Sequence, residues 1–218
     1  MSDLPSLGEL DLDGAIQEAA EQVDGDTRAA FLRKAGLGTA ALVGGGALVG
    51  GLPALASAAS SSDVAILNFA LTLEYLEAAF YTEAVAKGRF KGDLGRFARV
   101  VKEHEVAHVG FLKGALGSKA VKKPKFNFKG TTTSAAKFKA TAQALEDTGV
   151  AAYLGQVGNI KSKQILAAAG SILPIEARHA GWIRNINGES GAPSAFEAPK
   201  TKAQILAAVR QTGFIVRR

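Results

Sequence analysis

The chain has 218 residues, a length that suits one medium-sized domain with additional segments and suffices to bury a hydrophobic core. It contains no cysteine, which excludes disulfides and thiolate ligands, and it has only three histidines. The net charge of +6 is unevenly distributed, because the first 26 residues carry eight acidic side chains and no lysine or arginine. The basic residues further along are scattered without interleaved aromatics, so we expect no nucleic-acid partner.

Two segments are predicted to precede the folded domain. Residues 1–26 are acidic and poor in apolar side chains, which indicates a flexible tail. Residues 27–59 begin with Thr-Arg-Ala-Ala-Phe-Leu-Arg-Lys, continue as a long uncharged run and include the small-x-small sequence Ala56-Ser57-Ala58. This layout is typical of an export signal and resembles a twin-arginine signal, from which it departs at Ala29, where a second arginine is expected.

The fate of this signal has two alternatives. Cleavage would release the domain into the cell envelope or the exterior, whereas a retained segment could anchor it, because the apolar run over residues 35–59 is long enough to span a bilayer. The cations lie on the N-terminal side of the run, which places the downstream domain outside. We therefore predict an exported protein, and the N-terminal segment contacts the membrane if it is kept as an anchor.

The remainder of the chain predicts an all-α fold. Helical apolar patterns end at glycines, and no segment alternates like a strand for long. Residues 118–134 are basic, turn-rich and too long for a simple loop, which favours a crossover between the second and third helices of a bundle. Thr201 and Gln204 form a capping-box pattern before the last helix. The predicted helices are residues 63–87, 94–116, about 135–160 and about 162–187, followed by a short helix at 202–211.

A degenerate internal repeat carries the residues of chemical interest. The motif Glu-x-x-His occurs twice, 71 residues apart, and each copy is followed by a glycine, an aromatic, an aliphatic and a basic residue. A Glu-x6-Tyr motif precedes each copy. The motifs comprise Glu74 and Tyr81, Glu105 and His108, Glu146 and Tyr153, and Glu176 and His179.

The spacing of these motifs predicts a metal site. Residues three or seven apart share one face of a helix, so four antiparallel helices can bring four carboxylates and two imidazoles to one point. Four unneutralised carboxylates oppose burial, and two divalent ions would neutralise them. The donors suit Fe or Mn, with Zn as an alternative. The predicted ligands are Glu74, Glu105, His108, Glu146, Glu176 and His179.

Other polar residues are expected around the ligands. Tyr81 and Tyr153 lie too far along their helices to bind metal directly, so each is expected to hydrogen-bond a carboxylate across the bundle. Asp147 either pairs with a ligand histidine or faces solvent. Glu77 competes with Glu74 as the ligand of the first helix, but the repeat aligns Glu74 with a glutamate and Glu77 with a glycine, which favours Glu74.

The first Glu-x-x-His copy has a rival interpretation. His104, Glu105 and His108 spell His-Glu-x-x-His, in which the two histidines bind Zn²⁺ and the glutamate activates water, as in zinc proteases. The second copy lacks the first histidine, and the sequence offers no obvious third ligand. If the protease interpretation fails, His104 is either a partner of a ligand or an exposed helix residue, and the second option is favoured.

Residues 68–81, 144–153 and 175–180, together with the tail 193–199, resemble the ferritin-like superfamily, in particular the branch grouped with desiccation-related proteins. The resemblance implies a four-helix bundle over residues 60–190 with a di-metal centre, followed by a C-terminal extension over residues 191–218. Members handle iron, O₂ or peroxide, whereas many proteins of this branch have no assigned activity. The resemblance implies a ferroxidase-like or peroxide-handling oxidoreductase with a link to oxidative stress. The alternative is a non-catalytic, metal-stabilised structural protein, and a homo-oligomer is allowed in either case.

Overall fold

The computed structural model describes residues 59–216, so the predictions for the acidic tail and for the export segment up to residue 58 lie outside the described residues. Between residues 59 and 216 there are helices and one isolated antiparallel bridge, between Phe126 and Ile215, but no strand. The predicted all-α bundle with a short C-terminal helix is confirmed. The helices are α4 (Ser61–Lys87), α5 (Gly92–Leu116), α6 (Ala135–Val157), α7 (Lys163–Ile186) and α8 (Lys202–Thr212), with a 3-10 turn, η2 (Gly117–Lys119), after α5.

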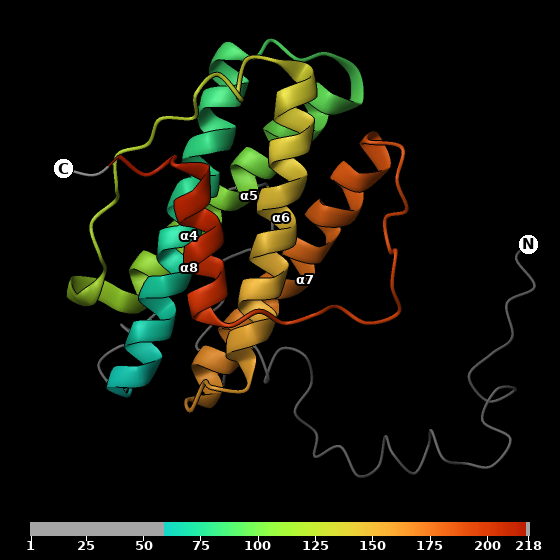
Figure 1. Ribbon diagram of the computed structural model, residues 1–218. Coiled ribbons are helices and arrows are strands. Elements are labelled where there is room, and N and C mark those ends of the chain that lie inside the picture. The colour runs from blue at the N-terminus through green and yellow to red at the C-terminus, as the bar shows by residue number, and fades with distance from the viewer. Residues whose placement is uncertain (1–58, 217–218) are drawn as a thin grey trace, which may run out of the picture. The chain divides into compact units, whose positions relative to one another are not determined.

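The four long helices form two hairpins that pack side by side (Figure 1). Short connections join α4 to α5 and α6 to α7, and the helices within each hairpin pack most extensively on each other. Contacts between α4 and α6 and between α5 and α7 complete the bundle. The ring order is therefore α4, α5, α7, α6, and each hairpin contains one copy of the sequence repeat. The long segment between α5 and α6 is the connection between the hairpins.

Within residues 59–216, every α-helix except α5 begins with a side-chain cap. The Ser60 hydroxyl accepts the N–H of Asp63 at 3.1 Å and caps α4. The Asp63 carboxylate, itself buried, accepts the backbone N–H groups of Lys161 and Ser162, which ties the start of α4 to the α6–α7 connection. Helix α5 begins at Gly92, before its predicted start at residue 94, so Asp93 lies in the first turn, where its charge favours the helix N-terminus.

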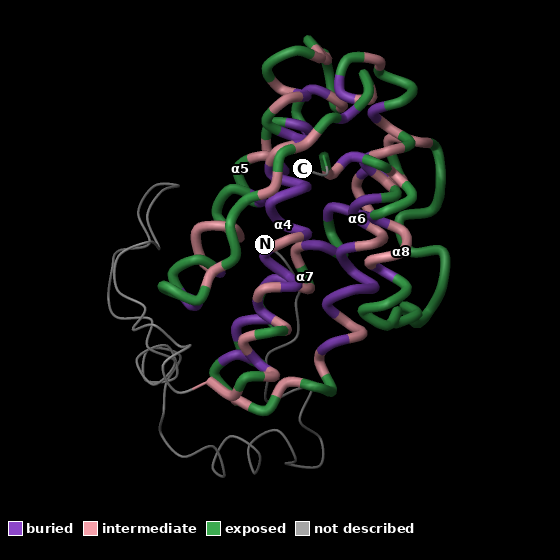
Figure 2. The backbone as a smooth tube through the Cα atoms, turned by 60° about the vertical axis from the view of Figure 1, so that its left-hand side comes forward, coloured by how far each residue is buried: buried purple, intermediate pink, exposed green. Residues whose placement is uncertain are grey.

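Helix α4 is the central element of the hydrophobic core. Most of its length is buried, as the purple segments of Figure 2 show, because α5, α6 and α8 surround it. A helix that is apolar nearly all round suits such a position. Its length and mean hydropathy of 1.3 would also allow a membrane span, but 67% of the relevant window is buried inside the bundle. We therefore assign α4 to the core.

The C-terminal extension returns along the α4/α6 side of the bundle (Figure 1). The predicted capping box between Thr201 and Gln204 is present at the start of α8. Ile205 and Val209 of α8 belong to the same buried cluster as residues of α4 and α6. Just before α8, the N–H of Lys200 donates to the carbonyl of Ala151 on α6 at 3.1 Å. The extension thus covers the face between α4 and α6.

Candidate metal centre

The six predicted ligands lie together in the middle of the bundle. Their donor atoms form two groups, and within each group the atoms lie within 4.8 Å of one another. Each group combines three carboxylates with one imidazole, and Glu105 and Glu176 belong to both groups. The first group is Glu74, Glu105, His108 and Glu176, and the second is Glu105, Glu146, Glu176 and His179.

The two histidines contact the carboxylates through the same ring nitrogen. Nδ1 of His108 lies 3.3 Å from Oε2 of Glu74 and 3.1 Å from Oε1 of Glu176. Nδ1 of His179 lies 3.1 Å from Oε1 of Glu105 and 3.2 Å from Oε2 of Glu146, but without hydrogen-bond geometry. Close approach without hydrogen bonding is the arrangement expected of donor atoms that surround a common point.

The centre fits divalent cations. All four glutamates are 0% exposed. A buried carboxylate without a partner is costly, and a bound cation removes this cost. Carboxylate and imidazole donors without sulfur suit Fe, Mn or Zn. Within residues 59–216, the buried side-chain atoms that lack a hydrogen-bond partner all belong to this centre: Glu74 Oε2, Glu105 Oε1, Glu146 Oε2, both carboxylate oxygens of Glu176, and His179 Nδ1.

Two tyrosines connect the hairpins at the centre. The hydroxyl of Tyr81 on α4 donates to Oε1 of Glu146 on α6. The hydroxyl of Tyr153 on α6 donates to Oε1 of Glu74 on α4 at 2.5 Å. Each bond leaves the other oxygen of the same carboxylate directed into the centre without a partner. The tyrosines therefore fix the orientation of two ligands, one from each copy of the repeat.

The electrostatics of the centre show how it is neutralised by protons when no cation is bound. Burial lowers the pKa of both predicted ligand histidines, but the close contacts with the carboxylates outweigh it and raise the pKa of His179 to about 10 and that of His108 well above its usual value. Burial, followed by the charge of Glu105, raises the pKa of Glu176 to about 8. Burial acts on Glu105 in the same direction, but the close contacts with the two histidines bring its pKa below the usual range.

His104 contacts the centre, although the sequence favoured an exposed residue without a role. Its side chain is exposed, yet its Nδ1 lies 2.8 Å from Nε2 of His179, the ring nitrogen that faces away from the carboxylates. The two rings stack with their centroids 5.1 Å apart. His104 belongs to neither ligand group, so this geometry does not support the zinc protease interpretation. The sequence shows only that His104 directly precedes Glu105. This position does not reveal a contact with a histidine on another helix.

Asp147 lies outside the centre. Its carboxylate pairs with the guanidinium of Arg184 on α7, with Nη2 at 2.8 Å and Nε at 3.1 Å, and it is one third exposed. The option that Asp147 pairs with a ligand histidine is therefore not realised. The reason is geometric, because Asp147 follows the ligand Glu146 directly and adjacent residues point about 100° apart around a helix.

Glu77 is buried beside the ligands, although the sequence favoured Glu74 alone. It is only 3% exposed. A Cβ atom at Gly149, the residue that the repeat aligns with Glu77, would lie 3.4 Å from Oε1 of Glu77 and 2.9 Å from Oε2 of Glu176. The choice between Glu74 and Glu77 was therefore incomplete, since α4 directs both carboxylates inward.

Comparison with known proteins gives one result. The sequence model of the family described as a ferritin-like domain matches residues 62–189, which is more than half of the chain. This range includes the four long helices, except the first residue of α4, and all six residues of the two ligand groups. No match was found among curated proteins.

Proposed function

The chain belongs to the ferritin-like family, and on that premise we propose that it is an exported di-metal carboxylate protein that handles O₂ or peroxide. It binds two ions of Fe or Mn and acts as a ferroxidase-like oxidoreductase. The observation that carries this proposal is the set of buried donor atoms without hydrogen-bond partners, which fall into two overlapping groups.

Charge balance supports two ions over one. The four ligand glutamates are fully buried, and two divalent ions neutralise four carboxylates. In this assignment Glu105 and Glu176 are shared by both ions, because both groups contain them. Each ion also has one glutamate and one histidine of its own.

The remaining residues of the chain hold and shield the pair. Tyr81 and Tyr153 orient two of the carboxylates, and His104 contacts the outer nitrogen of His179. Such a metal pair supplies electrons and Lewis acidity to a small oxidant. The ligands are too deeply buried for a large substrate to reach them without movement of the helices.

A small apolar cavity supports access by a small molecule. It has a volume of about 20 Å³, enough for a molecule the size of water or O₂, and its lining includes Leu73, Leu112 and Tyr153. The hydroxyl of Tyr153 contacts Glu74, so one side chain separates the cavity from a ligand.

Two finer parts of the proposal rest on the sequence alone. The signal-like segment at residues 27–59 supports export, either as a free protein or as one anchored by residues 35–59. The segments at 68–81, 144–153, 175–180 and 193–199 support a place in the desiccation-related branch. The second candidate function, a metal-stabilised structural protein of stress or desiccation, is favoured by the closed burial of the centre.

Metal analysis of the purified full-length chain tests the proposal. We expect two Fe or Mn ions per chain, loss of one in Glu146→Ala, and loss of both in Glu176→Ala, because Glu176, like Glu105, belongs to both groups whereas Glu146 belongs to one. Glu83→Ala on the same helix as Glu74 is the control, since Glu83 contacts Thr132 and Lys87 and should keep both ions.

Turnover then separates the two candidates. Oxidation of Fe(II) by O₂ or H₂O₂ in the loaded protein supports the oxidoreductase, whereas a loaded but inert protein supports the structural alternative. A single Zn ion that persists in Glu176→Ala would contradict both and would restore the protease interpretation.

A further inference from the structure

Glu77 is a fifth carboxylate of the metal centre that the six-ligand assignment does not use. It follows Glu74 by one helical turn on α4 and is 3% exposed. No hydrogen bond or ion pair of its carboxylate occurs within the part of the chain that the structure describes. Its oxygens are not among the fully buried atoms that lack a partner, and it belongs to neither ligand group, so Glu77 lies beside the six donors and would have to turn toward the ions to bind them.

The surroundings of Glu77 place it next to a ligand shared by both groups. Gly149 on α6 has no side chain, and the space beside it is bordered by Oε1 of Glu77 and Oε2 of Glu176. A Cβ atom at this position would lie 3.4 Å from the Glu77 oxygen and 2.9 Å from the Glu176 oxygen. The second distance is shorter than real Cβ contacts allow. The glycine therefore permits two carboxylates to approach the centre where any other residue would displace Glu176.

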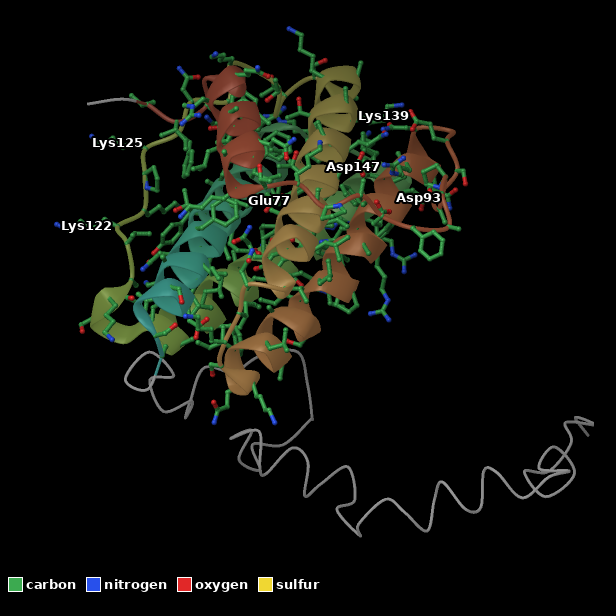
Figure 3. All side chains as sticks on the ribbon, turned by 60° about the horizontal axis from the view of Figure 1, so that its bottom comes forward. Glu77, Asp93, Lys122, Lys125, Lys139 and Asp147 are labelled. Carbon is green, nitrogen blue, oxygen red and sulfur yellow. The ribbon has the colours of Figure 1, made fainter. Side chains whose placement is uncertain are left out.

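Glu77 reaches the centre from the α4/α6 side. The two ligand histidines come from α5 and α7, which form the other side of the ring of helices. Figure 3 shows Glu77 among the helices, whereas Lys122 and Lys125 extend away from the bundle. The C-terminal extension packs on this side of the bundle through Ile205 and Val209 of α8.

We propose that Glu77 is a seventh ligand residue of the metal pair, which binds from the α4/α6 side beside Glu176. The pair would then have five carboxylates and two imidazoles. An additional hard oxygen donor favours Mn or Fe over Zn. This inference rests on the proposed function, because it requires that the other six residues bind metal.

The test is a titration of the chelator-treated full-length chain with Mn(II), followed by electron paramagnetic resonance. Glu77→Gln keeps the shape of the side chain but removes a strong ligand. We expect the affinity for at least one Mn(II) ion to fall about 10- to 100-fold, the range found when residues around a metal are replaced. The matched control is Glu83→Gln, also on α4, whose carboxylate is hydrogen-bonded to Thr132 and should not affect Mn(II) binding.

A second variant gives an independent measurement should Glu77→Gln fail to fold. Glu77→Asp keeps the charge but shortens the side chain by one methylene, so Mn(II) should bind more weakly. Glu83→Asp on the same helix is the matched control, because Glu83 contacts Thr132 and Lys87. A Glu77→Asp chain that binds Mn(II) as tightly as Glu83→Asp would count against the proposal.

The failure of the inference differs from the failure of the proposed function. If the wild-type chain binds two Mn(II) ions and Glu77→Gln binds them with the same affinity and the same spectrum, Glu77 is no ligand, and the di-metal assignment stands. If the wild-type chain binds neither Mn(II) nor Fe(II), the proposed di-metal function and the role of Glu77 are both wrong.

Discussion

At the scale of single residues, His104 is the group whose role is most open to experiment. A metal ion at Nδ1 of His179 leaves the proton on Nε2, which then donates to Nδ1 of His104 at 2.8 Å. We expect His104→Ala to lower the affinity for Mn(II) about 10-fold or more, and His104→Gln, whose amide oxygen can accept the same bond, to restore much of it. The neighbouring exposed Glu103→Gln serves as control in the same titration. Equal affinity in all three variants would show that the contact has no effect on metal binding.

The two tyrosines allow a second measurement at this scale. Tyr153→Phe removes the hydrogen bond to a fully buried carboxyl of Glu74 and leaves that oxygen without a partner. We expect the free energy of unfolding of the metal-free protein to fall by about 1–3 kcal/mol, measured by urea denaturation. Tyr81→Phe should have a similar effect through Glu146, since it occupies the matching position of the repeat. A loss in only one of the two variants would contradict their equivalence.

The residues differ in how far the sequence could predict them. The six members of the ligand groups could be placed on inward faces, because helical spacing relates positions on one helix. The contact of His104 could not be predicted in this way, since its partner His179 lies 75 residues away on α7. Glu77 was considered and set aside, because a repeat indicates which positions correspond and says nothing about the space that Gly149 leaves free.

At the scale of elements, the route of the C-terminal extension depends on Gly155 of α6. A Cβ atom there would lie 2.0 Å from the carbonyl oxygen of Lys200, so only glycine allows the chain to pass this close. We expect Gly155→Ala to lower the free energy of unfolding by about 1–3 kcal/mol through overpacking. Gly114→Ala, at a site with open space, should be neutral or stabilising by up to about 1 kcal/mol. Chemical denaturation compares the two, and equal effects would contradict a close contact at Gly155.

The bounds of the helices were easier to predict from the sequence than the path of the C-terminal extension. Helix ends at Gly88, Gly117 and Gly213 agree with the sequence, and Gly117 and Gly213 adopt a positive φ that glycine reaches without steric cost. The start of α5 was predicted too late, at residue 94 instead of Gly92, since an acidic residue such as Asp93 is equally suited to the cap and to the first turn. The path of the extension over α6 depends on contacts between distant segments, which a pattern along the chain does not contain.

At the scale of the whole molecule, the protons held by the centre link metal binding to pH. In the folded, metal-free protein the pKa of His179 is raised to about 10 and that of Glu176 to about 8, above their ordinary values of 6.5 and 4.5. Both groups therefore bind protons more tightly in the folded state, and the stability they contribute is present at low pH and lost as pH rises through the raised pKa values. We expect the melting temperature of the metal-free protein to fall between about pH 5 and pH 10, from the ordinary pKa of Glu176 to the raised pKa of His179.

The loaded protein supplies the control for this prediction. Metal ions displace the protons, so affinity should rise over the same pH range, and the melting temperature of the loaded protein should depend much less on pH. Melting curves of both forms, followed by circular dichroism, provide the comparison. Parallel curves for the two forms would contradict the assignment of these protons to the centre.

The division of the ligands between the two hairpins has a mechanical consequence. Each donor group takes three residues from one hairpin and one from the other, namely Glu176 in the first group and Glu105 in the second. Each ion of the proposed pair would thereby be a crosslink between halves of the chain that otherwise contact each other less extensively than the helices within each half. The halves could not separate without breaking metal–ligand bonds, so release of the ions would be as slow as the opening of the bundle itself.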